Sequence, residues 1–98
     1  MSVKQLKEAF AKKSLNSAII DIDGVGKVMV RELTLGDLDS VDYDGTSDAR
    51  AKNVALAIYT EDGKERIFNP EDANDVEIIK RLGNRVINQI TSALTQKN

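Results

Sequence analysis

The chain of 98 residues lacks several residue types on which enzyme and metal chemistry depend. It has no cysteine, which excludes disulfide bonds and thiolate metal ligands. It also has no histidine, so the commonest general base and most zinc ligands are missing. No apolar run reaches the roughly 18 residues of a transmembrane span, and the lysine-containing N-terminus lacks the apolar segment of a secretory signal. We therefore expect a soluble protein that is not an enzyme and has no metal or cofactor site.

The residues that are present are those of one ordinary globular domain. Hydrophobic residues make up 41% of the chain and charged residues 31%, which is typical of a small domain with a modest core. The net charge of −2 is uneven, because residues 1–20 carry four lysines and one glutamate, whereas residues 21–48 carry eight acids and two bases. The basic end is too short and too poor in aromatic residues to indicate nucleic-acid binding. We expect the acidic middle to be solvated surface, with attraction of a basic partner as the alternative.

The strongest periodic pattern lies at the C-terminal end, in residues 75–96. All of its large apolar side chains fall on one half of a helical wheel, which predicts a single amphipathic helix of about 20 residues that supplies much of the core. Gly83 lies within the apolar half, so we expect another backbone to approach the helix closely there. The alternative is that Gly83 ends one helix and Asn84 caps a second.

A second, shorter amphipathic helix is predicted at the N-terminus. Ser2 and Gln5 have the spacing of a capping box. Val3, Leu6 and Phe10 then share one face of the helix, and lysines occupy the others. We expect this face to pack on the core, with a membrane-surface helix as the alternative.

Residues 17–33 predict a β-hairpin. Alternating strands at 18–22 and 27–33 flank a turn with two glycines, which permit positive φ angles. The stretch from Asp21 to Glu32 also matches several positions of an EF-hand calcium loop. However, Val25 stands where that loop needs an oxygen ligand, and the flanks alternate like strands. We therefore expect a hairpin, and a calcium-binding regulator remains only an alternative.

Helix-start signals dominate the next part of the chain. Thr34 is a good N-cap, and Asp37 completes a second capping box. Residues 49–60 predict another helix, which we prefer to a strand at 54–59 because of four alanines.

A turn and an extended segment lead into the last helix. The sequence Glu-Asp-Gly-Lys at 61–64 predicts the turn, and residues 66–68 are expected to be extended and to bring Ile67 or Phe68 into the core. Asn69-Pro70 then predicts a short helical turn before the final helix. The fold class is thus α+β: a single small domain over residues 1–98, with an N-terminal helix and β-hairpin followed by three to four helices, the last long and amphipathic.

Two stretches of the chain resemble the phage tail assembly chaperone family. Residues 26–39 (GKVMVRELTLGDLD) contain a V-x-V-R-E-L-T signature similar to one near the start of these proteins. Residues 54–94 resemble their second half: an apolar helix, an acid-acid-Gly-Lys turn, an apolar-Phe pair and a polar-x-Glu-Asp helix start. The matching residues are Glu61, Asp62, Gly63, Lys64, Phe68, Glu71 and Asp72. The chain departs from the family in its short hairpin turn and in having Gly83-Asn84 where a proline is usual.

The resemblance implies a short, non-frameshifted chaperone made in the host cytoplasm during infection or from a prophage. Such proteins bind the tape measure protein and keep it soluble while tail tube protein polymerises around it. In many of them a frameshifted, extended form recruits the tail tube protein. The resemblance further implies a homo-oligomer that is absent from the mature virion. From the composition and the apolar pattern, we expect it to contact neither nucleic acid nor membrane. A small structural protein of the tail or neck is the alternative.

A chaperone of this kind needs exposed apolar surface. We expect its partner-binding residues on the edges of the last helix, at Ile78 and Ile87, and on the N-terminal helix, at Val3, Leu6 and Phe10. Each of these side chains could instead belong to the core.

Overall fold

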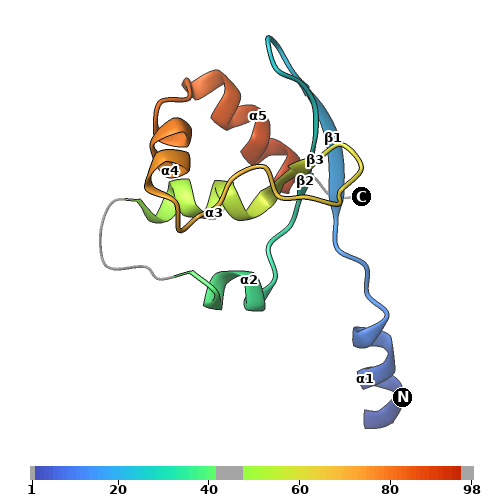
Figure 1. Cartoon of the computed structure of the whole chain (residues 1–98). Helices are drawn as coiled ribbons and strands as arrows, with labels where there is room; N and C mark the ends of the chain where they lie inside the picture. The colour runs from blue at the N-terminus through green and yellow to red at the C-terminus, as the bar shows by residue number, and fades with distance from the viewer. Residues whose placement is uncertain (1, 42–47, 96–98) are drawn as a thin grey trace.

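A computed structural model describes residues 2–41 and 48–95 and has the expected α+β architecture: one small domain in which helices lie against a three-stranded antiparallel sheet of order β1-β2-β3 (Figure 1). Helix α5 packs on strands β1 and β2, and α3 packs on α4. The elements, in chain order, are α1 (Val3–Ala11), β1 (Ser17–Ile22), β2 (Gly26–Arg31), α2 (Leu35–Asp39), α3 (Ala49–Ala57), β3 (Ile58–Thr60), α4 (Ala73–Lys80) and α5 (Asn84–Thr95).

The predicted hairpin is confirmed as strands β1 and β2. Their register runs from Ser17 opposite Arg31 to Ile22 opposite Gly26. In the turn, Gly24 and Gly26 have φ angles of 81° and 117°, a region that residues with a side chain rarely adopt. The segment that resembles a calcium loop is therefore part of the hairpin itself: it spans the end of β1, the turn and all of β2.

The helix predicted over residues 49–60 is two elements. Helix α3 ends at Ala57, and Ile58–Thr60 form β3, in which Ile58 pairs with Val30 and Thr60 with Val28. The prediction of helix to residue 60 was wrong because the alanines favour helix locally, while the strand depends on β2, which is distant in the sequence.

The single C-terminal helix was also wrong; the alternative of two helices is correct, but Gly83 does not end the first and Asn84 does not cap the second. Helix α4 ends at Lys80 and α5 begins at Asn84. The carbonyl of Gly83 accepts hydrogen bonds from the N–H groups of Val86 and Ile87, so Gly83 itself occupies the N-cap position. A Cβ added at Gly83 would meet no other atom within 4 Å, and the expected close approach of a second backbone is therefore wrong.

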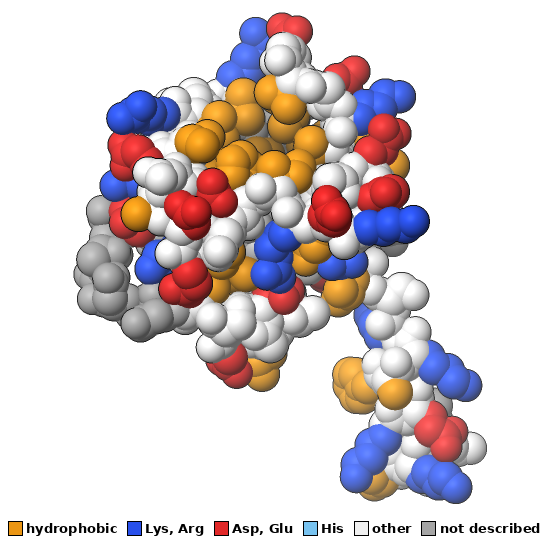
Figure 2. Space-filling view, in the orientation of Figure 1, with side chains coloured by type: hydrophobic (Ala, Val, Ile, Leu, Met, Phe, Trp, Pro, Cys, Tyr) orange, Lys and Arg blue, Asp and Glu red, His pale blue; other side chains and the backbone are white. Residues whose placement is uncertain are grey.

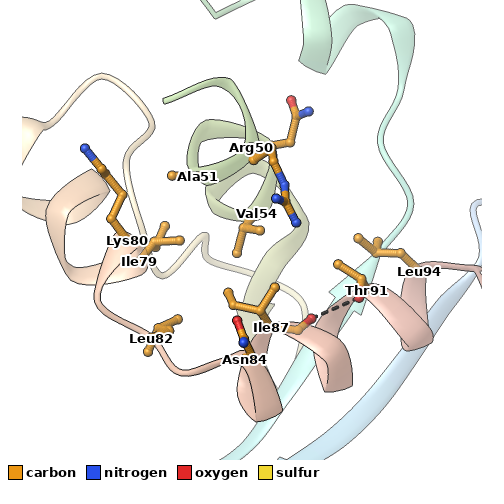
Figure 3. A pocket seen from close by; sticks show the side chains of 11 residues that line it. Arg50, Ala51, Val54, Ile79, Lys80, Leu82, Asn84, Ile87, Thr91 and Leu94 are labelled. Carbon is orange, nitrogen blue, oxygen red and sulfur yellow. Dashed lines mark hydrogen bonds between the residues drawn. The ribbon is translucent and has the colours of Figure 1, made fainter. Parts of the chain in front are cut away.

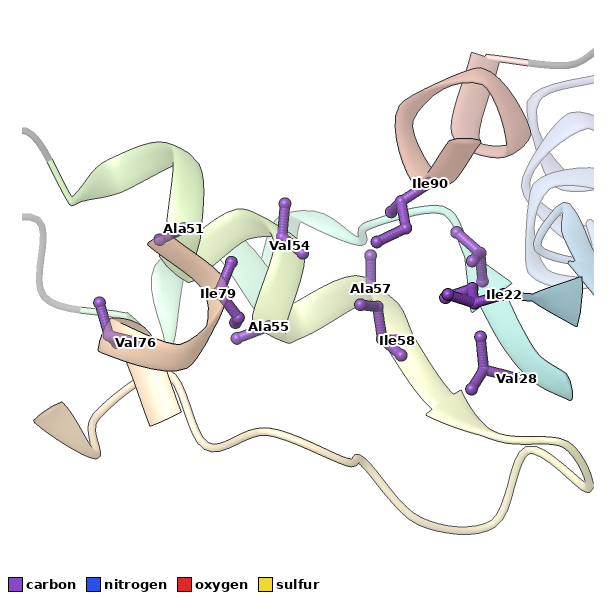
Figure 4. Close-up of a cluster of buried hydrophobic side chains, with 11 residues drawn as sticks. Ile22, Val28, Ala51, Val54, Ala55, Ala57, Ile58, Val76, Ile79 and Ile90 are labelled. Carbon is purple, nitrogen blue, oxygen red and sulfur yellow. The ribbon is translucent and has the colours of Figure 1, made fainter. Parts of the chain in front are cut away.

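The break between α4 and α5 lets one apolar pattern serve two parts of the core (Figure 4). Ile79 is 2% exposed beside the alanines of α3, whereas Ile90, fully buried, lies near the sheet residues Ile22 and Val28. Each such isoleucine contributes about 1.5–3 kcal/mol by leaving water. The core consists of Ile22, Val28, Val30, Ala51, Val54, Ala55, Ala57, Ile58, Val76, Ile79 and Ile90.

Helix α1 stands away from the rest of the domain (Figure 1). Its predicted capping box is present: the Ser2 hydroxyl accepts from the Gln5 N–H at 3.2 Å, and the Gln5 side chain accepts from the Ser2 N–H at 2.9 Å. Every residue of α1 is nevertheless exposed, so the expectation that it packs on the core was wrong. The caps form the helix locally, but residues 12–16 lead it away from the domain.

Further local predictions are confirmed, whereas the extended segment expected at 66–68 is only an isolated β-bridge at Arg66 followed by bends. Thr34 and Asp37 form a reciprocal capping box at the start of α2. Gly63 has a φ of 75° in the predicted turn, and Phe68, rather than the more exposed Ile67, packs against the core. The sequence of residues 42–47 also predicts a linker, with Thr46 and Ser47 as possible caps of the following helix, and these residues lie outside the described ranges.

Candidate partner-binding surfaces

Helices α3, α4 and α5 surround an apolar hollow of about 450 Å³ (Figure 3). Val54 of α3 and Ile87 of α5 point into it from two sides. The other apolar side chains of its wall are Ala51, Ile79, Leu82 and Leu94. In the space-filling view, hydrophobic side chains gather on the half of the domain that holds α5 (Figure 2). The hollow is therefore suited to receive an apolar side chain of another molecule.

Charged and polar groups form the rim of this hollow. Lys80 Nζ lies 3.0 Å from Asp48 Oδ1, which ties the end of α4 to the start of α3. The hydrogen bond and the negative charge of Asp48 raise the pKa of the Lys80 ammonium group. Arg50 and Asn84 complete the polar rim. The hollow thus combines apolar walls with a partly cationic rim.

The two isoleucines predicted on the last helix occupy different places. Ile87 is half-buried and lines the hollow. Ile78 lies on α4, is 50% exposed and does not line it. The break after α4 puts the two residues on different helices. A helical wheel drawn for one continuous helix therefore does not describe where their side chains point relative to each other. The structure thus supports only Ile87 as part of a formed concave surface.

The three residues predicted on the N-terminal helix do lie together. Val3, Leu6 and Phe10 form one apolar stripe along α1, and all three are exposed, Phe10 to 79%. Among the described residues, nothing covers this stripe. Figure 2 shows α1 as a separate body on which hydrophobic and basic side chains alternate. We call Val3, Leu6 and Phe10 the α1 stripe.

Sequence reasoning missed most of the hollow. Ile79, Leu82 and Leu94 lie on the apolar half of the predicted C-terminal helix, so their character was visible but their convergence was not. Val54 comes from α3, and only the packing of α3 against α4 brings it there.

A charged cluster lies around Tyr59 of β3. The Arg31 guanidinium is 4.0 Å from the centre of the Tyr59 ring, and Arg66 lies 5.7 Å from it. Arg66 also contacts Asp37 at 3.1 Å. Burial alone would raise the pKa of the Asp37 carboxyl group, but hydrogen bonds with Thr34 and the charges of Arg66 and Arg31 outweigh burial and lower it. These contacts tie α2 to the sheet and leave the cluster with a structural role.

The described acidic residues in the middle of the chain do not form a cluster. In residues 2–41 and 48–95, no group of three or more acidic side chains could hold a metal ion. Asp37 and Asp48 are engaged in ion pairs, and Asp42 and Asp44 fall outside that part. No helix within the same ranges is long and apolar enough to cross a membrane.

Comparison with known proteins gives the chain no relative: no family model, no curated protein and no solved structure matches it.

Proposed function

We propose that this protein is a phage or prophage tail assembly chaperone that binds the tape measure protein in the host cytoplasm and assists assembly of the tail tube. It acts by covering apolar surface, without catalysis, and works as a homo-oligomer. The observation that carries the proposal is the α1 stripe, a row of exposed apolar side chains on a helix that no described part of the domain covers. The resemblance of residues 26–39 and 54–94 to tail assembly chaperones supplies the identity of the partner.

Two surfaces would share the binding. An amphipathic segment of the tape measure protein can pack along the α1 stripe in the manner of paired helices. The hollow beside Ile87 can accept a further apolar side chain, because its walls are apolar and its rim is charged. A long apolar helical protein aggregates unless such surface is covered, so many copies of a small binder would keep it soluble.

Co-expression with the tape measure protein of the same genome tests the proposal. The wild-type chain should keep that protein soluble and co-purify with it. The double variant Leu6→Asp/Phe10→Asp should lose co-purification at an unchanged melting temperature, because both side chains are exposed. Leu35→Asp is the matched control, since Leu35 is also an exposed leucine but lies on α2.

The hollow is tested by comparing two isoleucines. Ile87→Asp should weaken co-purification more than Ile78→Asp, because only Ile87 lines the hollow. A folded wild-type chain that fails to keep the tape measure protein soluble contradicts the proposal. Detection of the chain in purified virions by mass spectrometry would favour a structural tail or neck protein instead.

A further inference from the structure

Strand β1 leaves one edge of the sheet open. It lies at the end of the strand order β1-β2-β3, and among the described residues no segment pairs with its outer side. The opposite edge differs, because β3 has three residues and is bordered by the segment after it: Ile67 N–H donates to the Ile58 carbonyl and Thr60 N–H to the Glu65 carbonyl. An uncovered edge strand of six residues is a template for pairing with another chain.

The hydrogen-bonding pattern shows which residues face the open edge. Glu32 N–H donates to the Asn16 carbonyl, so the even-numbered residues of β1 bond to β2. By the alternation of antiparallel ladders, the backbone groups of Ser17, Ile19 and Asp21 point outward. Gln89 of α5 already donates to the Asp21 carbonyl at 2.7 Å, so the free main-chain groups end at Ile19.

The side chains along this edge form a self-complementary series. The side chains of Ser17, Ile19 and Asp21 are exposed, while those of Ala18 and Ile20 are half-buried toward α5. Continued through the exposed residues before the strand, every second residue reads Lys13, Leu15, Ser17, Ile19 and Asp21. The series has a base at one end, an acid at the other and an apolar residue next to each polar end, with Ser17 at its centre.

We propose that two copies of this chain pair through β1 in antiparallel orientation about a two-fold axis at Ser17, forming a continuous six-stranded sheet. In that register Leu15 of one copy lies opposite Ile19 of the other, and Lys13 lies opposite Asp21, twice each by symmetry. Pairing covers two side chains that are 41% and 52% exposed in the single copy. The proposal concerns this chain alone and does not depend on the identity of its partner.

The position of α1 fits this arrangement. With Lys13 opposite Asp21, the C-terminal end of α1 in one copy lies beside the hairpin turn of the other, where Val25 is exposed. An element that extends away from its own domain would thus lie alongside the second copy, and its stripe stays available to a third molecule.

Analytical ultracentrifugation of the purified chain alone tests the pairing. The wild type should form a dimer whose Kd rises at least about tenfold in Ile19→Lys, because a lysine replaces an apolar contact twice. Leu35→Lys, which alters a still more exposed residue on α2, should leave the Kd unchanged. Lys13→Asp should weaken the dimer at low salt, and adding Asp21→Lys should restore it.

A cysteine at the proposed axis gives an independent measurement, because the chain has no cysteine of its own. Mild oxidation should cross-link Ser17→Cys into a disulfide-bonded dimer, since directly opposed residues lie about 5.5 Å apart, within disulfide range. Ser40→Cys, exposed at the end of α2, should remain monomeric on denaturing gels. A monomer at the highest soluble concentration, a dimer weakened equally by Ile19→Lys and Leu35→Lys, or cross-linking through Ser40→Cys alone would each overturn the proposal.

Discussion

Helices α1 and α5 are both amphipathic, yet one lies outside the domain and the other is central to it. The apolar face of α5 packs on the sheet and buries Ile90 completely, whereas the apolar face of α1 leaves Phe10 79% exposed. The amphipathic pattern therefore establishes that a face needs covering, but not which molecule covers it. The contrast also shows that α5 contributes to the folded core, whereas the described residues leave the apolar face of α1 uncovered.

Length adds to this contrast. A helix of nine residues is marginal in water when it stands alone, because nucleation costs more than a few hydrogen bonds return. The capping box helps α1 but gives it no tertiary support. We therefore expect α1 to gain helicity when its stripe is covered, while the helicity of α5 follows global folding.

The largest difference should come from truncating one apolar side chain in each helix. Ile90→Ala should lower the free energy of unfolding by about 2–5 kcal/mol, because it leaves a cavity in the core. Phe10→Ala should change it by less than about 0.5 kcal/mol, since the ring is exposed. Urea titrations followed by circular dichroism measure both, and equal losses would contradict the separation of α1 from the core.

A smaller difference should separate the two capping boxes. Thr34→Ala should cost about 1 kcal/mol, because α2 is tied to the sheet through the Asp37–Arg66 ion pair. Ser2→Ala removes the same kind of cap from α1 and should leave the urea midpoint unchanged, while reducing helical signal slightly. A shifted midpoint for Ser2→Ala would mean that α1 does pack on the domain.

The Asp37 ion pair should also show in the pH dependence of stability. Because the pKa of the folded Asp37 carboxyl group is lowered, its contribution is present above its ordinary value of about 3.9 and is lost as the pH falls through the folded value. The stability difference between wild type and Asp37→Asn should therefore be constant near neutral pH and shrink below about pH 4. Asp39→Asn, at an exposed position of the same helix, is the control, and a difference that persists in acid would rule out this linkage.

The smallest effect is expected at Gly83. Gly83→Ser should stabilise the protein by a few tenths of a kcal/mol, because Gly83 occupies the N-cap of α5 and serine is the better cap there. Space is no obstacle, since a Cβ at this position meets nothing within 4 Å. In thermal melts, Gly83→Ser should have a higher melting temperature than the wild type and Gly83→Ala a lower one. A large fall in melting temperature for both variants would indicate that another backbone does pack closely against Gly83.

Features set by neighbouring residues could be predicted from the sequence. Both capping boxes, the hairpin and the turn at Gly63 depend on contacts within a few residues, and all are present. Strand β3 overlaps the rejected alternative of a strand at 54–59: its partner β2 is about 30 residues away in the chain, and its own alanine-rich surroundings favour helix. The break at Gly83 was visible only as an alternative, because the apolar pattern continues in phase across it.

The candidate surfaces divide in the same way. The α1 stripe could be predicted, since Val3, Leu6 and Phe10 belong to one helix whose periodicity defines the face. The hollow could not, because it requires three helices to converge and only Ile87 of its wall was singled out. The sequence did not determine whether the α1 stripe is exposed, because the apolar residues recur with the same period on a buried helix face and on an exposed one.

The exposed segment between α1 and β1 has a consequence for proteolysis. Lys12 and Lys13 lie there, outside any helix or strand, so a trypsin-like protease should cut this segment before any other described part of the chain. Such a cut would release α1 and leave the sheet and its packed helices intact, because none of the core residues precedes Ile22. One cleavage would therefore remove the proposed binding helix from a molecule that stays folded, and protection from that cleavage would report whether α1 is covered.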